Sequence, residues 1–187
     1  MLRIIAGKHK NRAISTLKRT IYRPSTSKIR EAIFSILGSG EFLKQNILEN
    51  STVLDVFCGS GSLGFEALSR GAKTVTFIDI NINCLRLAQQ FAIDIGEEKN
   101  TRFLNLDSAF LPKANAKYNL VFIDPPYHSK LIHKAIDSLI KGNWLEKDSV
   151  IIIEQAKFED LALPNNFSLI TERLYNNNRL SFLTYGQ

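Results

Sequence analysis

The stretch Thr52-Val53-Leu54-Asp55-Val56-Phe57-Cys58-Gly59-Ser60-Gly61-Ser62-Leu63-Gly64 decides how this chain folds. Its first six residues are mostly apolar and are typical of a strand buried on both faces. The glycines after them indicate a tight turn, and a helical pattern begins at Leu63. A strand, a glycine turn and a helix in this order begin the βαβ unit of an open parallel sheet.

The same alternation continues along the chain. Strands are predicted at residues 52–57, 75–78, 102–106, 118–123 and 150–153, and helices at residues 63–70, 83–95 and 129–141. Regular alternation of this kind predicts an α/β fold with a doubly wound, mostly parallel sheet. Residues 167–175 and 180–185, joined through Asn176-Asn177-Asn178, are predicted to form an antiparallel hairpin at the sheet edge.

The first 50 residues differ from the rest in pattern and charge. Two short apolar stretches, 2–6 and 13–17, predict a hairpin with a basic tip, and a helix is predicted to follow Pro24 and to end at Gly38. Nine of the 24 basic residues and none of the 18 acidic residues lie among residues 1–30. Such segregation is typical of an element that contacts a phosphate backbone, although a solvated arm without a partner would look the same. We therefore divide the chain into a basic extension (1–50), which is the candidate for nucleic-acid contact, and an α/β domain (51–187).

Seven basic residues of this extension are the candidates for nucleic-acid contact: Arg3, Lys8, Lys10, Arg12, Arg23, Lys28 and Arg30. Lys28 and Arg30 fall near the first turn of the predicted helix, where the helix dipole disfavours cations. An anion bound there would explain their placement, and so would simple tolerance at a surface.

The sequence argues against a membrane-spanning, secreted, metal-binding or disulfide-bonded protein. No apolar run approaches the ~18 residues that a membrane span needs, and the start of the chain breaks into charge too early for a signal peptide. The two cysteines, Cys58 and Cys84, form neither a metal-binding pattern nor a disulfide framework. We expect a monomeric, metal-free protein in the cytoplasm.

The glycine turn predicts a nucleotide-like cofactor. Gly59 and Gly61 allow close approach of the backbone, and Asp79 ends the next strand, where a carboxylate can accept hydrogen bonds from ribose hydroxyls. The same spacing also fits a nicotinamide dinucleotide. Asp55 and a second acidic motif at Asp124 favour S-adenosylmethionine instead, because that ligand carries an ammonium and a sulfonium.

Three further residues are assigned around this turn. Asp107 follows a strand and could receive the adenine amino group, and Phe57 is expected to wall the pocket. Cys58 is interpreted as a small packing residue and not as a nucleophile.

The turn Asp124-Pro125-Pro126-Tyr127 follows the strand at 118–123 and carries the chemistry. An acidic acceptor, a stiff backbone and an aromatic face can hold a flipped-out base at its exocyclic amine. Tyr127 is predicted to stack on that base, although a core aromatic would occupy the same position. His128 and His133 are interpreted as surface residues. Asp124 favours guanine, which presents adjacent N1–H and N2–H donors, without excluding adenine.

These strings resemble the bacterial guanine-N2 methyltransferases of small-subunit (16S) ribosomal RNA. The resemblance covers nearly the whole chain and rests on four stretches: residues 3–7, residues 23–31, the glycine turn continued to Gly71, and the turn that begins at Asp124. It implies a seven-stranded class I methyltransferase fold with an antiparallel C-terminal strand. It also implies S-adenosylmethionine as the methyl donor, and ribosomal RNA or an assembling small subunit as the partner. Ser25 departs from the threonine usual in the family.

Two alternatives remain open from the sequence. An adenine-N6 methyltransferase acting on DNA or RNA would use the same catalytic residues, although no separate target-recognition domain is visible outside residues 1–50. A non-catalytic RNA-binding assembly factor could retain a degenerate cofactor pocket. The intact set Asp55, Gly59, Gly61, Asp79 and Asp124 argues against such decay.

Overall fold

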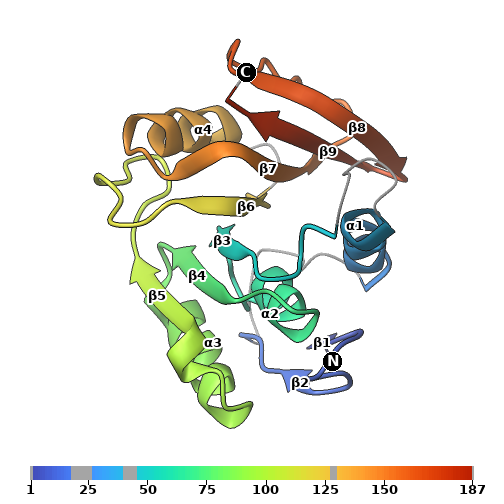
Figure 1. Cartoon of the computed structure of the whole chain (residues 1–187), viewed down its shortest axis with the longest axis vertical. Coiled ribbons are helices and arrows are strands. Elements are labelled where there is room, and N and C mark those ends of the chain that lie inside the picture. Colours follow the sequence, from blue (N-terminus) through green and yellow to red (C-terminus); the bar gives the residue numbers. More distant parts are fainter. Residues whose placement is uncertain (1, 18–26, 40–45, 127–129, 187) are drawn as a thin grey trace.

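A seven-stranded sheet forms the centre of the molecule (Figure 1). The computed structural model describes residues 2–17, 27–39, 46–126 and 130–186. In chain order the strands of this sheet are β3 (Thr52–Val56), β4 (Thr74–Asp79), β5 (Thr101–Asn105), β6 (Tyr118–Ile123), β7 (Leu145–Ala156), β8 (Phe167–Tyr175) and β9 (Asn178–Tyr185). Their order across the sheet is β5-β4-β3-β6-β7-β9-β8. The strands β3 to β7 pair in parallel, and β9 is antiparallel to both β7 and β8. The predicted fold class is confirmed.

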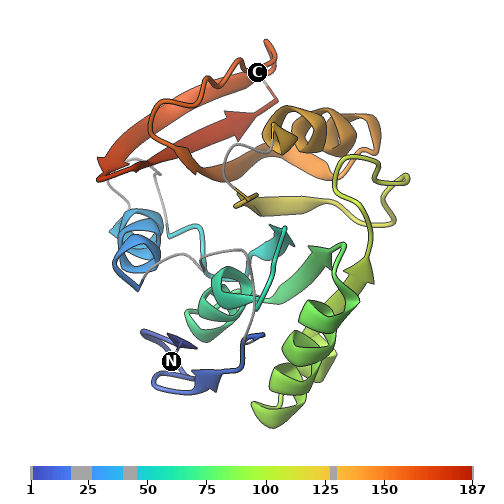
Figure 2. The ribbon, with the colours of Figure 1, turned by 180° about the vertical axis from the view of Figure 1, so that it is seen from behind.

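Helices cover both faces of the sheet, as Figures 1 and 2 show together. One face carries α1 (Ser27–Ser39), α2 (Ser62–Ser69) and α3 (Ile82–Asp94), and the other carries α4 (Leu131–Lys141). A short 3-10 turn, η1 (Glu98–Asn100), joins α3 to β5. Alternate residues of a strand point to opposite faces, so β3 sends Val53 into one core and Leu54 into the other. Both are fully buried.

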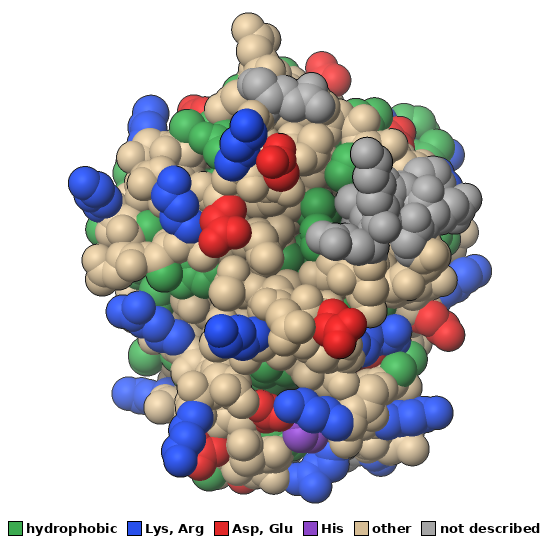
Figure 3. Space-filling model, in the orientation of Figure 1, with side chains coloured by type: hydrophobic (Ala, Val, Ile, Leu, Met, Phe, Trp, Pro, Cys, Tyr) green, Lys and Arg blue, Asp and Glu red, His purple; other side chains and the backbone are tan. Residues whose placement is uncertain are grey.

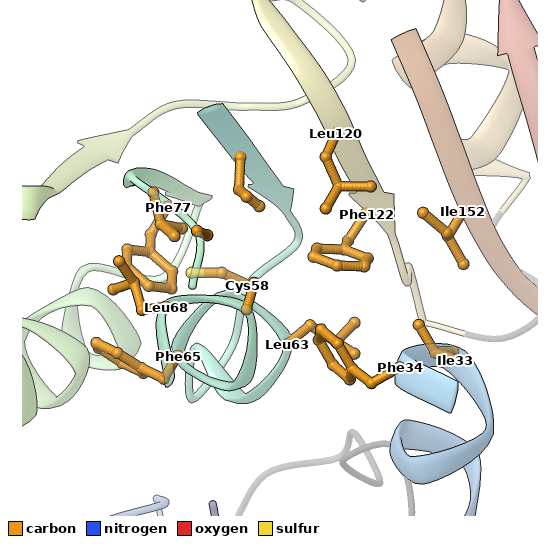
Figure 4. Packing of buried hydrophobic residues seen from close by; sticks show 14 of the residues in the cluster. Ile33, Phe34, Cys58, Leu63, Phe65, Leu68, Phe77, Leu120, Phe122 and Ile152 are labelled. Carbon is orange, nitrogen blue, oxygen red and sulfur yellow. The ribbon is translucent and has the colours of Figure 1, made fainter. Parts of the chain in front are cut away.

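Large aromatic and aliphatic side chains fill the face under α1, α2 and α3 (Figure 4). Phe34 of α1 lies 5.7 Å, ring centroid to ring centroid, from Phe122 of β6. Phe65 of α2 packs at 4.7 Å against Phe77 of β4. The contact between Phe34 and Phe122 ties the N-terminal helix to the sheet, although the two residues lie far apart in the sequence.

The N-terminal hairpin is much shorter than predicted. Its strands, β1 (Leu2–Arg3) and β2 (Ala13–Ile14), contain two residues each and pair antiparallel. The apolar stretches predicted strands of five residues, but Gly7 takes a φ of 81° and the chain beyond Arg3 turns onto α2. Ile4 and Ile14 are buried against the body of the protein.

One strand is much longer than its apolar run. The sequence predicted residues 150–153, whereas β7 begins at Leu145 and ends at Ala156. Between Leu145 and Ser149 the strand is polar, with Lys147 and Asp148 exposed, and Asp148 has a φ of 61°, so no alternation of apolar residues marks this part. Its last residues pair with β9, with Gln155 opposite Arg179. Pairing with a neighbouring strand, which sequence periodicity does not report, extends β7.

Candidate active site

The sheet changes winding direction between β3 and β6, and the acidic candidates gather at this point. The chain passes from β3 to β4 on one side, whereas β6 pairs with β3 on the other. Asp55 lies in β3, Asp79 ends β4 and Asp124 directly follows β6. Ligands of open α/β sheets bind at the carboxyl ends of the strands at such a switch point.

The glycine turn after β3 has a constrained backbone. Phe57 has a φ of 64°, which is uncommon for a bulky residue and costs on the order of 1–3 kcal/mol. The Cys58 N–H donates to the Ile78 carbonyl at 2.9 Å, so the turn is held to the end of β4. Gly59 follows with a φ of 51°, and a Cβ there would meet open space. A ligand can therefore approach the backbone at Gly59.

Asp55 is a buried carboxylate with little local support. It is 2% exposed, and among the described residues one hydrogen bond reaches it, from the Gly64 N–H at 2.9 Å. Burial raises the pKa of Asp55 to about 7, and the charge of Asp79 adds to the rise, although the bond from Gly64 acts the other way. A cationic group bound beside Asp55 would stabilise its ionised form. The donor set therefore fits a positively charged ligand.

Asp79 shapes the turn with both of its carboxylate oxygens. Oδ2 accepts the Gly59 N–H at 2.8 Å, and Oδ1 accepts the Asn81 N–H at 2.7 Å. Each oxygen retains a second acceptor position, because a carboxylate offers about four lone-pair sites. The predicted contact with ribose hydroxyls is compatible with this arrangement.

Asp107 lies at the same edge of the sheet, beyond the end of β5. The strand β5 pairs with β4 so that Asn105 stands opposite Asp79. Asn105 Nδ2 donates to the carbonyls of Asp79 and Ile80, both at 2.9 Å. Nothing in the sequence around Asn105 indicates this contact. The carboxylate of Asp107 accepts the Ala109 N–H at 2.9 Å and is exposed, so it remains available as a further acceptor.

The Asp124 turn begins beside the glycine turn. Val56 and Ile123 are partners in the register of β3 and β6, so Phe57 and Asp124 are the next residues on neighbouring strands. Asp124 is half-buried and Pro125 is buried. Tyr127 and His128 lie outside the described residues, and their predicted roles are not addressed by the structure.

The remaining candidates near the site have structural environments. Cys58 is 7% exposed and belongs to the core beneath α2 (Figure 4). Burial, with the charges of Asp55 and Asp79, raises the pKa of the Cys58 thiol well above its usual value, so a thiolate nucleophile is disfavoured. His133 is exposed on α4. Within the described ranges, no group of three or more His, Cys, Asp and Glu residues could hold a metal ion, and no helix is long and apolar enough to cross a membrane.

The structure corrects one member of the basic set. Arg30 was predicted to contact nucleic acid, but it is 1% exposed beneath the N-terminal segment. Its Nη2 donates to the Arg3 carbonyl at 3.0 Å, and burial lowers the pKa of its guanidinium. Arg30 faces inward because apolar α1 neighbours such as Ile29 and Ile33 occupy the same buried side of the helix. A residue this buried does not present its charge to a surface ligand.

The other basic residues occupy different surroundings. Lys8 pairs with Glu97 at 2.6 Å, and Arg12 Nη2 donates to the Asp94 carbonyl at 2.7 Å. These contacts place the hairpin tip at the C-terminal end of α3. Arg3, Lys10 and Lys28 are exposed, with Lys28 in the first turn of α1, and Arg23 lies outside the described residues. Figure 3 shows Lys and Arg side chains gathered over the lower part of the molecule, where Figure 1 places the hairpin.

Comparison with known proteins agrees with this geometry. Residues 2–184 match the family described as "Conserved hypothetical protein 95". The chain belongs to this family. Its sequence is 38% identical to an uncharacterized methylase of Rickettsia prowazekii, over 100% of this chain and 98% of that protein. It is 34% identical to "Ribosomal RNA small subunit methyltransferase D" of Haemophilus influenzae, over 92% and 88% of the two chains.

A solved structure confirms the class I methyltransferase fold. The "putative methyltransferase yhhF" of Escherichia coli superimposes with a TM-score of 0.85 at 27% identity, over 99% of this chain and 98% of that one. The resemblance identified from the N-terminal and Asp124 motifs is therefore confirmed at the level of the family.

Proposed function

We propose that this protein transfers a methyl group from S-adenosylmethionine to N2 of a guanine in small-subunit ribosomal RNA. The observation that carries the proposal is the placement of Asp124 directly after buried strand β6, beside the glycine turn at the switch point of the sheet. The name of the Haemophilus influenzae relative supports the choice of RNA.

The cofactor would lie along the carboxyl edge of β3, β4 and β5. Asp55, with a raised pKa, suits the cationic methionine part of the ligand. At Gly59 the ligand could come close to the protein backbone, because no side chain is in the way. Asp79 and Asp107 would accept hydrogen bonds from the ribose and the adenine. Phe57 and Gly61 complete the predicted set around the turn. When bound, the cofactor supplies an electrophilic methyl group on a sulfonium.

Asp124 would activate the acceptor amine. The lone pair of an aromatic amine is delocalised into the ring, so the amine is a poor nucleophile. A carboxylate and the Pro125 carbonyl that accept its N–H bonds would localise the lone pair and align it for an in-line displacement. Pro126 would stiffen the turn, and Tyr127 would stack on the base, a contact worth on the order of 1–3 kcal/mol.

The same carboxylate favours guanine over adenine. Guanine presents N1–H and N2–H side by side, and two carboxylate oxygens can accept both together. In adenine and cytosine the ring nitrogen beside the amine is an acceptor, so it would repel the second oxygen. Asp124 thus supports N2 of guanine as the methyl acceptor.

Exposed basic residues would hold the RNA backbone. Arg3, Lys8, Lys10, Arg12 and Lys28 are described on the exposed surface of the N-terminal segment, and Arg23 is retained from the sequence alone. Their charge would release condensed counterions from RNA, which makes binding dependent on salt.

The test is transfer of labelled methyl from S-adenosylmethionine to unmodified small-subunit RNA and particles, with duplex DNA in parallel, followed by nucleoside identification. We expect label in N2-methylguanosine that is lost in Asp124→Ala and kept in Asp137→Ala, a control on the exposed side of α4. Label in adenine would replace the proposed acceptor. RNA binding without cofactor binding would contradict an enzymatic function and favour a non-catalytic assembly factor.

A further inference from the structure

The N-terminal hairpin is short, and four backbone hydrogen bonds between Ile4 and Arg12 supplement its ladder. Its ladder joins two residues of β1 to two residues of β2. A two-stranded hairpin is marginally stable in water even when it is longer, so this one depends on contacts with the body of the protein. Figure 2 shows it next to the end of α2. The contacts that fix it therefore decide where its basic side chains point.

Glu66 of α2 makes the central contact. Its side chain is 0% exposed. Oε2 accepts the Ile5 N–H at 2.7 Å, and Oε1 accepts the Ala6 N–H at 3.0 Å. Oε1 also accepts Nε of Arg70, one helical turn later, at 2.7 Å. One carboxylate thus satisfies two backbone donors of the segment that leads into the basic tip.

Ser69 of the same helix binds Ala6, Lys8 and His9. Its carbonyl accepts the Lys8 N–H at 2.8 Å, its Oγ accepts the His9 N–H at 3.0 Å, and its hydroxyl donates to the Ala6 carbonyl. A Cβ at Gly7 would overlap the backbone of Ser69, so a side chain there would separate the two segments. The backbone from Ile5 to His9 is therefore fixed along α2.

A buried carboxylate such as that of Glu66 is an unusual choice for a residue that serves stability alone. Burying a carboxylate costs several kcal/mol before its partners compensate, and well-packed apolar residues often stabilise as well as a buried ion pair. What the carboxylate adds is direction, because its hydrogen bonds to the Ile5 and Ala6 N–H groups weaken steeply when the donors leave their preferred distance and angle. Nearby Arg30, whose Nη2 binds the Arg3 carbonyl, interacts electrostatically with Glu66 and adds a second constraint on the hairpin.

We propose that Glu66 is a positioning residue for RNA: it fixes the basic hairpin relative to the glycine turn at the other end of α2. The inference rests on the proposed function. Helix α2 has its N-cap at Gly61 and ends at Ser69, so one rigid element of eight residues carries both the cofactor turn and the hairpin dock. At 1.5 Å per residue the two ends are about 12 Å apart. RNA contacts at the hairpin are thereby held at a set distance from the reacting methyl group.

The test compares Glu66→Gln and Ser69→Ala with the control Ser138→Ala. Ser138, on α4, is also a buried helical serine that accepts a backbone N–H, from Leu111 at 2.6 Å, but it lies away from the hairpin. For Glu66→Gln we expect KM for RNA to rise at least about tenfold and the salt slope of RNA binding to fall by about two to three, the loss of the tip contacts. Ser69→Ala should show a smaller change in the same direction. Ser138→Ala should change neither quantity.

Other readouts separate positioning from loss of fold. Cofactor affinity and kcat at saturating RNA should stay within about twofold of the parent, and only the hairpin amides, Ile5 and Ala6 first, should exchange hydrogen faster. The proposal would be overturned if the Ile5 and Ala6 amides of Glu66→Gln exchange hydrogen faster while the salt slope of its RNA binding is unchanged. If neutralising Lys8, Lys10 and Arg12 together also leaves the slope unchanged, the hairpin is not the RNA surface. That second result contradicts the proposed RNA contacts and is distinct from a failure of Glu66 alone.

Discussion

The two ends of α2 each involve a buried carboxylate, and the two are supported very differently. At the N-terminal end Asp55 receives one hydrogen bond among the described residues, from Gly64, and its pKa is raised to about 7. At the C-terminal end Glu66 receives three, from Ile5, Ala6 and Arg70. A carboxylate short of donors beside an open turn is suited to a ligand, whereas one surrounded by donors links parts of the protein.

The backbone is also open at the N-terminal end of α2 and closely packed at its C-terminal end. Next to Asp55 the chain is strained at Phe57 and open at Gly59. Next to Glu66 it is closely packed, because Gly7 lies against the backbone of Ser69. We therefore expect changes near the glycine turn to affect cofactor and turnover, and changes near the hairpin to affect RNA binding.

The largest effect should come from Asp124→Ala. Loss of the acceptor that activates the amine should lower kcat by about 10²–10³-fold, the loss seen when one preorganised electrostatic group is removed. RNA affinity and its salt slope should stay near those of the parent, because the basic hairpin is untouched. Single-turnover transfer and RNA binding measured on one preparation would check this. Equal losses in turnover and cofactor affinity would contradict the role assigned to Asp124, and a large loss of RNA affinity would contradict the separation of the two regions.

Asp55 should give the protein a pH dependence with a defined sign. Its pKa is raised from 3.8 to about 7 in the folded chain, so the unfolded chain loses this proton first. Stability of the cofactor-free protein should therefore fall as pH rises from about 4 to about 7, by roughly 4 kcal/mol on the usual conversion. Above pH 7 the contribution should be constant.

The Asp55→Asn variant tests whether Asp55 causes this pH dependence of stability. It should remove the fall in stability when chemical denaturation of variant and parent is compared across pH 4 to 8. Cofactor affinity of the parent should rise towards pH 7 and then level off, because the ionised carboxylate attracts the cationic ligand, and the variant should lack that rise. Parallel pH profiles for parent and variant would assign the titration to another group.

A pair of glycine variants tests the packing at the cofactor end. A Cβ at Gly64 would lie 2.7 Å from Val75 Cγ1 and would also meet the Phe77 ring, so Gly64→Ala should destabilise by about 1–3 kcal/mol. Its backbone N–H serves Asp55, so cofactor affinity should fall as well. Gly38→Ala, where a Cβ meets open space in α1, should be neutral or stabilise by up to about 1 kcal/mol. A Gly64→Ala variant as stable as Gly38→Ala would show that the crowding at Gly64 is relieved by movement of Val75 and Phe77.

Periodicity was sufficient for the sheet and its helices. The predicted strand at 118–123 and the predicted tail strand at 167–175 match β6 and β8 to the residue. The glycine turn and the Asp124 turn were found because their residue types have few other uses at the end of a buried strand. Asp79, Asp107 and Asp124 lie at or just beyond strand ends, as the sequence indicated, and parallel strands bring these ends to one edge of the sheet, while the roles assigned to the acids stay predictions.

The docking of the hairpin could not be predicted. Glu66 contacts Ile5 across 61 residues of chain, and a glutamate inside a helix usually faces solvent. His9 is likewise held by Glu97, at 2.6 Å, and no local pattern reports such a partner. The burial of Arg30 was missed for the same reason, because the charge of an arginine suggests a surface and its environment is set by distant segments.

The smallest expected effect is the change in the salt slope of RNA binding when single lysines at the hairpin tip are replaced. Lys10 is exposed, and its replacement by Ala should lower the salt slope of RNA binding by about one unit while leaving kcat unchanged. Lys134→Ala, an exposed lysine on α4, should leave the slope as it is. Lys8 differs because its Nζ already pairs with Glu97 at 2.6 Å. If that pair persists with RNA bound, Lys8→Ala should lower the slope by less than Lys10→Ala. Equal slopes for the two variants would mean that RNA draws Lys8 away from Glu97, and that the hairpin tip adjusts when RNA binds.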